Sequence, residues 1–366
     1  MSRRSTGQRR GRAAGLTAAL IGLASLTLLA AHAGAKPYVP RNGQLYHGVS
    51  DTGEVRDFNR FRNQVSEHPA VLQEFFHWDV SLTASKATKR WDRTDTLGVV
   101  SMSTKLPANG RPDISPQAIA KGRGDHYLLR LNEITGNLGQ PTYMRLMPEM
   151  NGHWNPYSAF NADGTRRGRR HTTGDFKRAW RRVVLIVQGG SRDRVNRKLR
   201  RNHLPRIYRA KSNHAPIYDH RDVPRMLERP KIAFMWVPQT FGSPNINGNQ
   251  PQDYWPGSRF VDWVGADIFS KFQTAFDDLR AFYRRYDDHP FVIGEYSPWD
   301  GDPNGAFTRR LLAWSESHRR VRMLIYYRSV TADNEFSIGR YPAARGVLRR
   351  HLGKGRWDPF APHTRD

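Results

Sequence analysis

Two glutamates that follow short apolar runs are the residues of this sequence best placed for acid–base chemistry. Glu149 lies in the stretch PTYMRLMPEMNGHW, where an apolar run ends in a carboxylate, an amide, an imidazole and an indole within six residues. Glu295 ends the apolar run FVIGE. A carboxylic acid donates a proton, and a carboxylate accepts one or attacks an electrophilic carbon. The two glutamates act together only if the fold brings both run ends to one place.

The apolar runs before these glutamates belong to a series of eight, which alternates with segments that have helical spacing or the length of long loops. Strands separated by helices pair in parallel, and eight such units in about 330 residues predict an α/β fold, the (β/α)8 barrel. The carboxyl ends of barrel strands share one mouth, so both glutamates are expected there. The predicted strands are 44–49, a strand within 70–80, 97–102, 141–147, 232–237, 260–268, 291–295 and 322–327.

The helices and the domain organisation follow from the same spacing. We predict one catalytic domain over 36–366. The segment 192–209 carries Arg or Lys at many positions before the fifth strand, which indicates a basic insertion near 190–230. The predicted helices are 57–67, 115–137, 175–187, 275–286, 303–318 and 341–352.

The first 35 residues have the layout of a secretory signal peptide. A basic stretch precedes an uncharged apolar run over 13–31, and the small-residue sites AHA and AGA follow. We expect a secreted or extracytoplasmic protein. A membrane anchor at the N-terminus is the alternative, because the run is near the lower length limit of a spanning helix. The chain has no cysteine, which excludes disulfides and thiolate metal sites.

The composition is strongly basic, with 59 Lys and Arg against 33 Asp and Glu and a formal net charge of +26. An excess of this size fits an anionic polymer as partner. We expect no nucleic acid, because the charge is spread over much of the chain and the aromatic residues lie mostly beside apolar runs. The segment 192–209 has two open interpretations: a solvated outer surface, or a binding surface for an anionic cell-envelope polymer.

Two carboxylates at one barrel mouth are what retaining glycoside hydrolysis requires. One attacks the anomeric carbon, and the other protonates the leaving oxygen and then deprotonates water, with the two roughly 5–5.5 Å apart. We therefore predict Glu149 and Glu295 as catalytic residues, with a structural ion pair to a nearby arginine as the alternative. We expect no cofactor and no metal, because His47, His77 and His153 lie on different loops without short ligand spacing.

Aromatic residues follow several predicted strands. Sugar rings stack on indoles, while sugar hydroxyls bind short polar side chains. His77 and Asp267 are expected either to contact a sugar hydroxyl or to serve the structure. We predict a sugar cleft lined by five aromatic residues: Trp78, Trp154, Trp236, Trp299 and Tyr326. Packing in the core is the alternative, above all for Tyr326.

Four stretches together resemble glycoside hydrolase family 26. RLMPEMNGHW is similar to its acid/base motif, which runs Arg, two residues, His, then Glu-Met-Asn-Gly. FMWVPQ at 234–239 resembles the fifth strand of the family, and FVIGEYS at 291–297 resembles its nucleophile strand. DYWPGSRFVDWVGADIF at 253–269 is similar to its Tyr-Pro-Gly segment and sixth strand. The resemblance implies a retaining (β/α)8 hydrolase of internal β-linkages in a polysaccharide of β-mannan or β-glucan type.

The resemblance also implies roles for single residues. Glu149 would be the acid/base and Glu295 the nucleophile. Arg145 would orient a carboxylate below the pair. Trp154 would line the sugar site nearest the cut and Trp236 a neighbouring wall. The motif residues Asn151 and His153 are expected to contact the polysaccharide substrate as well.

Two positions depart from the family pattern. Pro148 stands where the family has histidine, and Phe269 stands where it has tyrosine. Proline offers no donor and phenylalanine no hydroxyl, so substrates other than mannan stay open. A non-catalytic carbohydrate-binding protein on a glycosidase scaffold is the alternative function. The presence of both glutamates favours the hydrolase.

Overall fold

Eight parallel strands close into a barrel in the computed structural model, which describes residues 38–50, 54–105, 113–207, 223–272, 275–328 and 334–358. Each strand pairs in parallel with the next along the chain, and the last pairs with the first, for example Tyr46 opposite Met323. The (β/α)8 fold predicted from the sequence is therefore confirmed. The barrel strands are β1 (Leu45–Ser50), β2 (Val71–Phe76), β3 (Leu97–Met102), β4 (Thr142–Leu146), β7 (Ile232–Trp236), β8 (Trp263–Phe269), β9 (Phe291–Ser297) and β10 (Val321–Tyr326).

The strands are apolar on both faces because each face is covered. One cluster of buried side chains takes a member from every barrel strand, such as Tyr46, Tyr143 and Trp263, and fills the interior. The larger cluster joins the outward faces of the strands to the helices. Parallel strands buried on both sides read as continuous apolar runs, which is why the sequence marks their positions so clearly.

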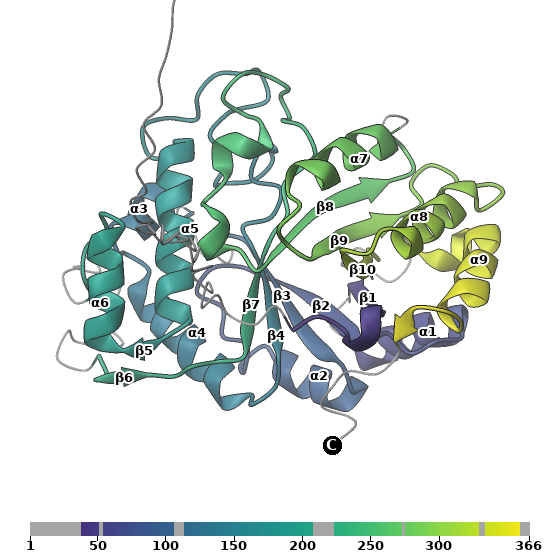
Figure 1. Cartoon of the computed structure of the whole chain (residues 1–366), viewed down its shortest axis with the longest axis horizontal. Coiled ribbons are helices and arrows are strands. Elements are labelled where there is room, and N and C mark those ends of the chain that lie inside the picture. Colours follow the sequence, from purple (N-terminus) through teal and green to yellow (C-terminus); the bar gives the residue numbers. More distant parts are fainter. Residues whose placement is uncertain are drawn as a thin grey trace, which may run out of the picture. The chain divides into compact units, whose positions relative to one another are not determined.

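Helices follow most of the strands and surround the barrel (Figure 1). The predicted helix over 115–137 is two helices, because Gly122 takes a left-handed φ of 92° between them and ends the first. The helix α2 was not predicted, since only Ala87, Trp91 and Thr94 of its eight residues are buried. The helices are α1 (Val55–Val65), α2 (Ala87–Thr94), α3 (Pro116–Ala120), α4 (Asp125–Asn137), α5 (Thr173–Val187), α6 (Arg192–Arg201), α7 (Ala275–Arg285), α8 (Ala306–Ser317) and α9 (Pro342–Leu352).

The basic segment before the fifth barrel strand contains the helix α6. The short strands β5 (Gly190–Ser191) and β6 (Met226–Leu227) pair antiparallel on either side of it in the chain. Asn132 of α4 ties this segment to the barrel helices, because its amide donates to the carbonyls of Val187 and Glu228 at 2.8 and 2.9 Å. Residues 208–222 of the predicted insertion lie outside the described residues.

The remaining elements are short. β11 (Trp357–Asp358) pairs with β1, and four 3-10 helices are described: Arg41–Gly43, Pro251–Tyr254, Ser258–Phe260 and Ile338–Arg340. The predicted signal segment over 1–35 lies outside the described residues. In the part of the chain that is described, no helix has the length and apolar content needed to cross a membrane.

Candidate active site

The carboxyl end of β4 carries Glu149 on a tight and strained turn. Met147 and Glu149 have left-handed φ angles of 42° and 50°, which cost a side-chain-bearing residue about 1–3 kcal/mol each. The turn is fixed from both sides: the amide of Met147 donates to Met102 at 2.7 Å, and that of Glu149 donates to Val237 at 2.7 Å. The backbone is thus held in a conformation that presents the Glu149 side chain beside β3 and β7.

Two donors hold the carboxylate of Glu149. The indole Nε1 of Trp154 donates to its Oε2 at 2.9 Å, and the amide of Gln239 donates to its Oε1. Asn151 fixes Gln239 in turn through the backbone. The Asn151 side chain accepts from the backbone N–H of Gln239 at 2.9 Å and donates to the backbone carbonyls of Gln239 and Phe241 at 3.0 Å. Asn151 is fully buried, so it positions the loop after β7 and does not reach a substrate.

Glu295, at the end of β9, shares a buried ionic cluster with two other strands. The guanidinium of Arg145 on β4 donates to Glu295 Oε1 and to Asp267 Oδ2 on β8. Gln73 of β2 also donates to Glu295 Oε1, at 3.4 Å. Gly294 leaves room for the cluster, because a Cβ there would lie 2.8 Å from Asp267 and 3.1 Å from Arg145. Residues of four strands thereby meet in one buried cluster.

Burial and crowding of like charges set the protonation of this cluster. Burial raises the pKa of Glu295 to about 7, and the charge of Glu149 adds to the rise, while Arg145 and Gln73 oppose it. Burial also raises the pKa of Asp267 well above its usual range, against the effect of Arg145. Burial alone would lower the pKa of Arg145, but the carboxylates around it raise the pKa instead. One guanidinium among three carboxylates therefore keeps a proton in the site near neutral pH.

A cavity of about 330 Å³ contains both glutamates. Trp154 and Gln239 contact Glu149. An aromatic wall lies next to the end of β9, which carries Glu295, because Phe269 pairs with Ser297 and the backbone amide of Tyr327 donates to the carbonyl of Tyr296. The rings of the wall touch one another, with centroids 4.8 Å apart for Tyr327 and Phe336 and 5.2 Å apart for Trp299 and Phe336. The wall comprises Phe269 at the end of β8 and four residues from the segments after β8, β9 and β10: Phe272, Trp299, Tyr327 and Phe336.

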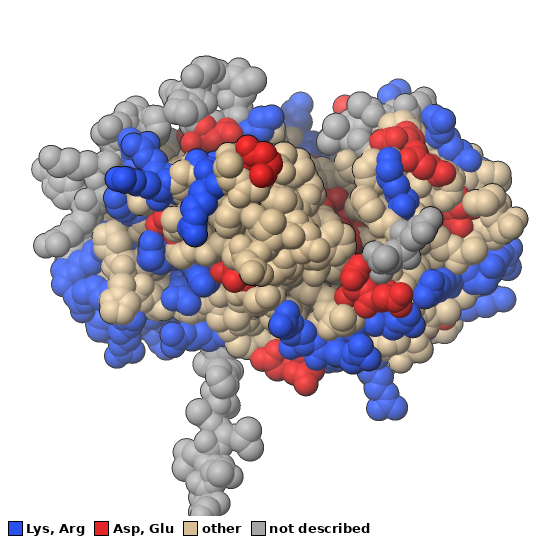
Figure 2. Space-filling view, turned by 90° about the horizontal axis from the view of Figure 1, so that it is seen from above, with Lys and Arg blue, Asp and Glu red and all other residues tan. Residues whose placement is uncertain are grey.

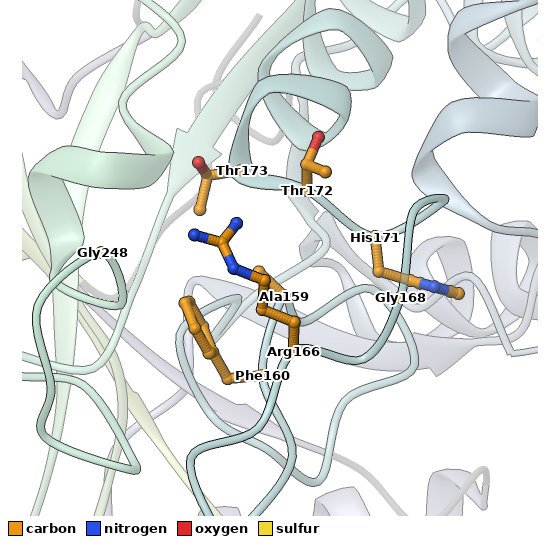
Figure 3. Close-up of a pocket in the computed structure, with 8 residues that line it drawn as sticks. All are labelled: Ala159, Phe160, Arg166, Gly168, His171, Thr172, Thr173 and Gly248. Atoms are coloured by element: carbon orange, nitrogen blue, oxygen red, sulfur yellow. The ribbon is translucent and has the colours of Figure 1, made fainter.

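A second, smaller cavity of about 110 Å³ lies beside the start of α5 (Figure 3). Thr172 caps the helix there and Thr173 begins it, and Arg166 lies across from Thr173 (Figure 3). Its lining includes neither Glu149 nor Glu295, so the candidate active site is the larger cavity.

The structure brings several predicted site residues to the larger cavity. Glu149, Glu295, Trp154 and Trp299 line it, and Arg145 lies behind it in contact with Glu295. The roles of these residues in catalysis and binding stay predictions. Sequence reasoning did not predict four cavity residues: Gln239, Phe272, Tyr327 and Phe336. Tyr327 was placed in the last predicted strand, which ends one residue earlier, and the other three belong to loops whose course no periodicity reveals.

Three predicted sugar-binding aromatics are corrected by their burial. The exposed fractions of Trp78, Trp236 and Tyr326 are 2%, 0% and 0%, so none presents a ring face for stacking. Trp78 packs on Tyr127 of α4. The other two point outward from the barrel, with the Trp236 ring against Phe282 of α7 and the Tyr326 ring against Phe61 of α1. These side chains belong to the layer between strands and helices.

The two predicted histidines lie outside the set of cavity residues as well. His77 is exposed just beyond β2. His153 is half-buried, with its Nδ1 3.4 Å from the Ser243 hydroxyl and its ring against Trp154.

Within the described ranges, no three His, Cys, Asp or Glu side chains gather in a way that could hold a metal ion.

The eight parallel strands and the helices around them define the fold as a (β/α)8 barrel, with two glutamates at its mouth. No protein-family model matches the sequence, and a comparison with curated proteins finds no match. Solved structures do share the fold. The YdhT protein from Bacillus subtilis is similar with a TM-score of 0.54 and 14% identity over 90% of each chain.

Two further structures have the same architecture. The Bacillus subtilis mannanase BCman is similar with a TM-score of 0.52 and 14% identity over 88% of each chain. The GH26 domain of an endo-β-mannanase/endo-β-glucanase from Prevotella bryantii is similar with a TM-score of 0.52 and 9% identity, covering 86% of this chain and 90% of that one. The resemblance to glycoside hydrolase family 26 is confirmed at the level of the fold.

Proposed function

We propose that this protein is a retaining glycoside hydrolase that cuts internal β-linkages of a polysaccharide, of β-mannan or β-glucan type. The observation that carries the proposal is the meeting of Glu149 and Glu295 in one cavity, from the ends of β4 and β9, with Arg145 behind the cavity in contact with Glu295. Retaining hydrolysis needs two carboxyl groups with different tasks at one anomeric carbon. The fold shared with a mannanase and with an endo-β-mannanase/endo-β-glucanase supports the polysaccharide class.

Glu295 is the proposed nucleophile. In the first step its carboxylate oxygen bonds to the anomeric carbon, the bond from that carbon to the leaving oxygen breaks, and the leaving oxygen takes a proton from Glu149. Arg145 and Gln73 donate to Glu295 Oε1, which leaves Oε2 for the attack. Arg145 thereby orients the nucleophile and favours its ionised form.

Glu149 is the proposed acid/base. In the second step it accepts a proton from water while the water oxygen bonds to the anomeric carbon and the ester to Glu295 breaks. Its donors stabilise the carboxylate that remains after the first step: the indole of Trp154 and the amide of Gln239. The first step needs Glu295 ionised while Glu149 carries a proton, so the proton that burial favours on Glu295 must lie on Glu149 when the nucleophile attacks.

The aromatic wall opposite Glu149 is the proposed support for the sugar ring. Trp299 presents a partly exposed indole, with Lys271 4.5 Å from its ring centre, and Phe272 is 49% exposed. Phe269 is nearly buried in this wall and offers no hydroxyl to Glu295 or to the sugar. The sugar at this position is therefore held by ring contacts more than by hydrogen bonds on this side.

The test is reducing-sugar release from glucomannan, galactomannan, lichenan, β-1,3-glucan, xylan and alginate. Glu149→Gln and Glu295→Gln are compared with Glu133→Gln, a control on the exposed surface of α4. Release from at least one polymer by the wild type and the control, lost in both active-site variants, supports the proposal. No release from any polymer, with polymer binding retained in all variants, would establish the non-catalytic carbohydrate-binding protein instead.

The stereochemical outcome tests the mechanism separately. Proton NMR identifies the anomer that is released first from the polymer that the protein cleaves. Retention of the β-configuration is expected for a glycosyl–Glu295 intermediate, and an α-product would overturn the assignment of Glu295 as nucleophile.

We also propose that the protein acts outside the cytoplasm. N-terminal sequencing of the mature protein tests this proposal, because it shows whether and where the signal segment is cleaved.

A further inference from the structure

The helix α6 separates an apolar face from a cationic face. Val195 and Leu199 are buried and pack the helix onto the domain. Four cations repeat at positions i, i+3, i+4 and i+7, a spacing that places them in one stripe along the helix. This cationic stripe consists of Arg194, Arg197, Lys198 and Arg201, which together line a surface concavity of about 360 Å³.

Within the described part of the chain, the cationic stripe has no acidic partner in an ion pair. Among the residues that the structure describes, no carboxylate forms an ion pair with any of the four, and α6 itself contributes a single acid, Asp193. Partial burial lowers the pKa of Lys198, and the charges of Arg194 and Arg229 lower it further. Like charges at these spacings destabilise a helix, so the stripe costs stability that the packing of α6 does not require.

The cationic stripe is separate from the candidate active site. α6 lies on the outer side of α5, away from the barrel strands (Figure 1). Lys and Arg side chains gather at the left of the space-filling view, which is the side where α6 lies in Figure 1 (Figure 2). No residue of the stripe lines the cavity that holds Glu149 and Glu295.

The chemistry of the stripe selects among anionic partners. Arginine forks bind carboxylates in a bidentate way, and seven residues of helix span roughly 10 Å, enough for several contacts along one extended chain. The described exposed side chains of α6 include no aromatic ring, whereas proteins that bind single-stranded nucleic acid combine basic grooves with aromatic stacking. A carboxylated glycan fits these features better than a single-stranded nucleic acid.

We propose that the cationic stripe of α6 is a non-catalytic binding surface for a linear polysaccharide that bears carboxylates. The surface holds the protein on an acidic polymer while the barrel mouth stays free. The inference does not depend on the proposed hydrolase activity, because it uses none of the cavity residues.

The test measures binding of the full chain to alginate over a series of salt concentrations. The variant R194Q/R197Q/K198Q/R201Q is compared with R309Q/R310Q/R349Q/R350Q, which removes the same charge from exposed positions on α8 and α9. The α6 variant is expected to bind at least about tenfold more weakly, with the slope of log Kd against log salt lower by about three to four. The control variant is expected to stay within about threefold of the wild type.

Several results would overturn the proposal. Equal losses in the two variants would show that net charge alone attracts the polymer, and absence of alginate binding by the wild type would remove the partner. Tighter binding of single-stranded DNA than of alginate, dependent on the same four residues, would assign the stripe to nucleic acid. Glu149→Gln is expected to keep wild-type alginate binding, and the α6 variant is expected to keep any activity on neutral polymers, so failure of one proposal is distinguishable from failure of the other.

Discussion

Replacing Arg145 by methionine is expected to destabilise the fold and to inactivate the site together. The side chain of Arg145 is 2% exposed, and those of its partners Asp267 and Glu295 are 0% and 10% exposed. Removing one member of a buried ionic cluster leaves buried carboxylates without compensation, at a cost of about 3–5 kcal/mol. For a domain of about 300 residues this corresponds to a fall in melting temperature of roughly 5–8 °C.

The pH dependence of this loss follows from the directions of the pKa shifts. Burial raises the pKa values of Glu295 and Asp267 and Arg145 opposes the rise, so both pKa values rise further in Arg145→Met. A group whose folded pKa is raised stabilises the fold below its unfolded pKa and loses that contribution as the pH rises through the folded pKa. The melting temperature of the variant should therefore fall less at about pH 5 than at about pH 8.

A second buried arginine provides the matched control. Arg182 of α5 is fully buried, and its Nε donates to Asp125 of α4 at 2.7 Å, away from the cavity. Arg182→Met is expected to lose similar stability but to keep activity below its melting temperature. Differential scanning fluorimetry at both pH values and reducing-sugar assays at a temperature where all variants are folded make the comparison. An Arg145→Met protein that melts like the wild type, or that melts equally early at both pH values, would refute the reasoning.

Three other substitutions test single contacts. Glu149→Gln should lower the pKa of Glu295 from about 7, because the charge of Glu149 helps to raise that pKa. The acidic limb of the pH profile of kcat/KM on an activated aryl glycoside should then move to lower pH. An acidic limb that does not move would contradict the coupling. Trp154→Phe keeps an aromatic side chain but removes the indole N–H that donates to Glu149, so kcat/KM should fall about twofold to tenfold without a change in melting temperature. Asn151→Ala removes the side chain that holds the Gln239 loop and should lower the free energy of unfolding in urea by about 2–4 kcal/mol. An unchanged unfolding midpoint would show that Asn151 does not hold the loop.

The sequence by itself determined the barrel and the meeting of its two glutamates. Eight apolar runs stand out because parallel strands are buried on both faces, and their alternation with helices leaves few topologies. Once the strands are parallel, the ends of β4 and β9 lie at the same mouth, so Glu149 and Glu295 meet whatever the loops do. The resemblance to family 26 rested on these same strand ends, and the solved structures confirm it at the level of the fold only.

Only the tertiary structure decided which side chains reach the cavity. A strand that is apolar on both faces does not reveal which side chains point inward, so Trp236 and Tyr326 were predicted in the site but pack against the helices. The bridge from Arg145 to Asp267 joins residues 122 positions apart, and no local pattern encodes it. The aromatic wall depends on loops after three strands, whose paths are set by packing across the mouth and not by the periodicity of any one segment.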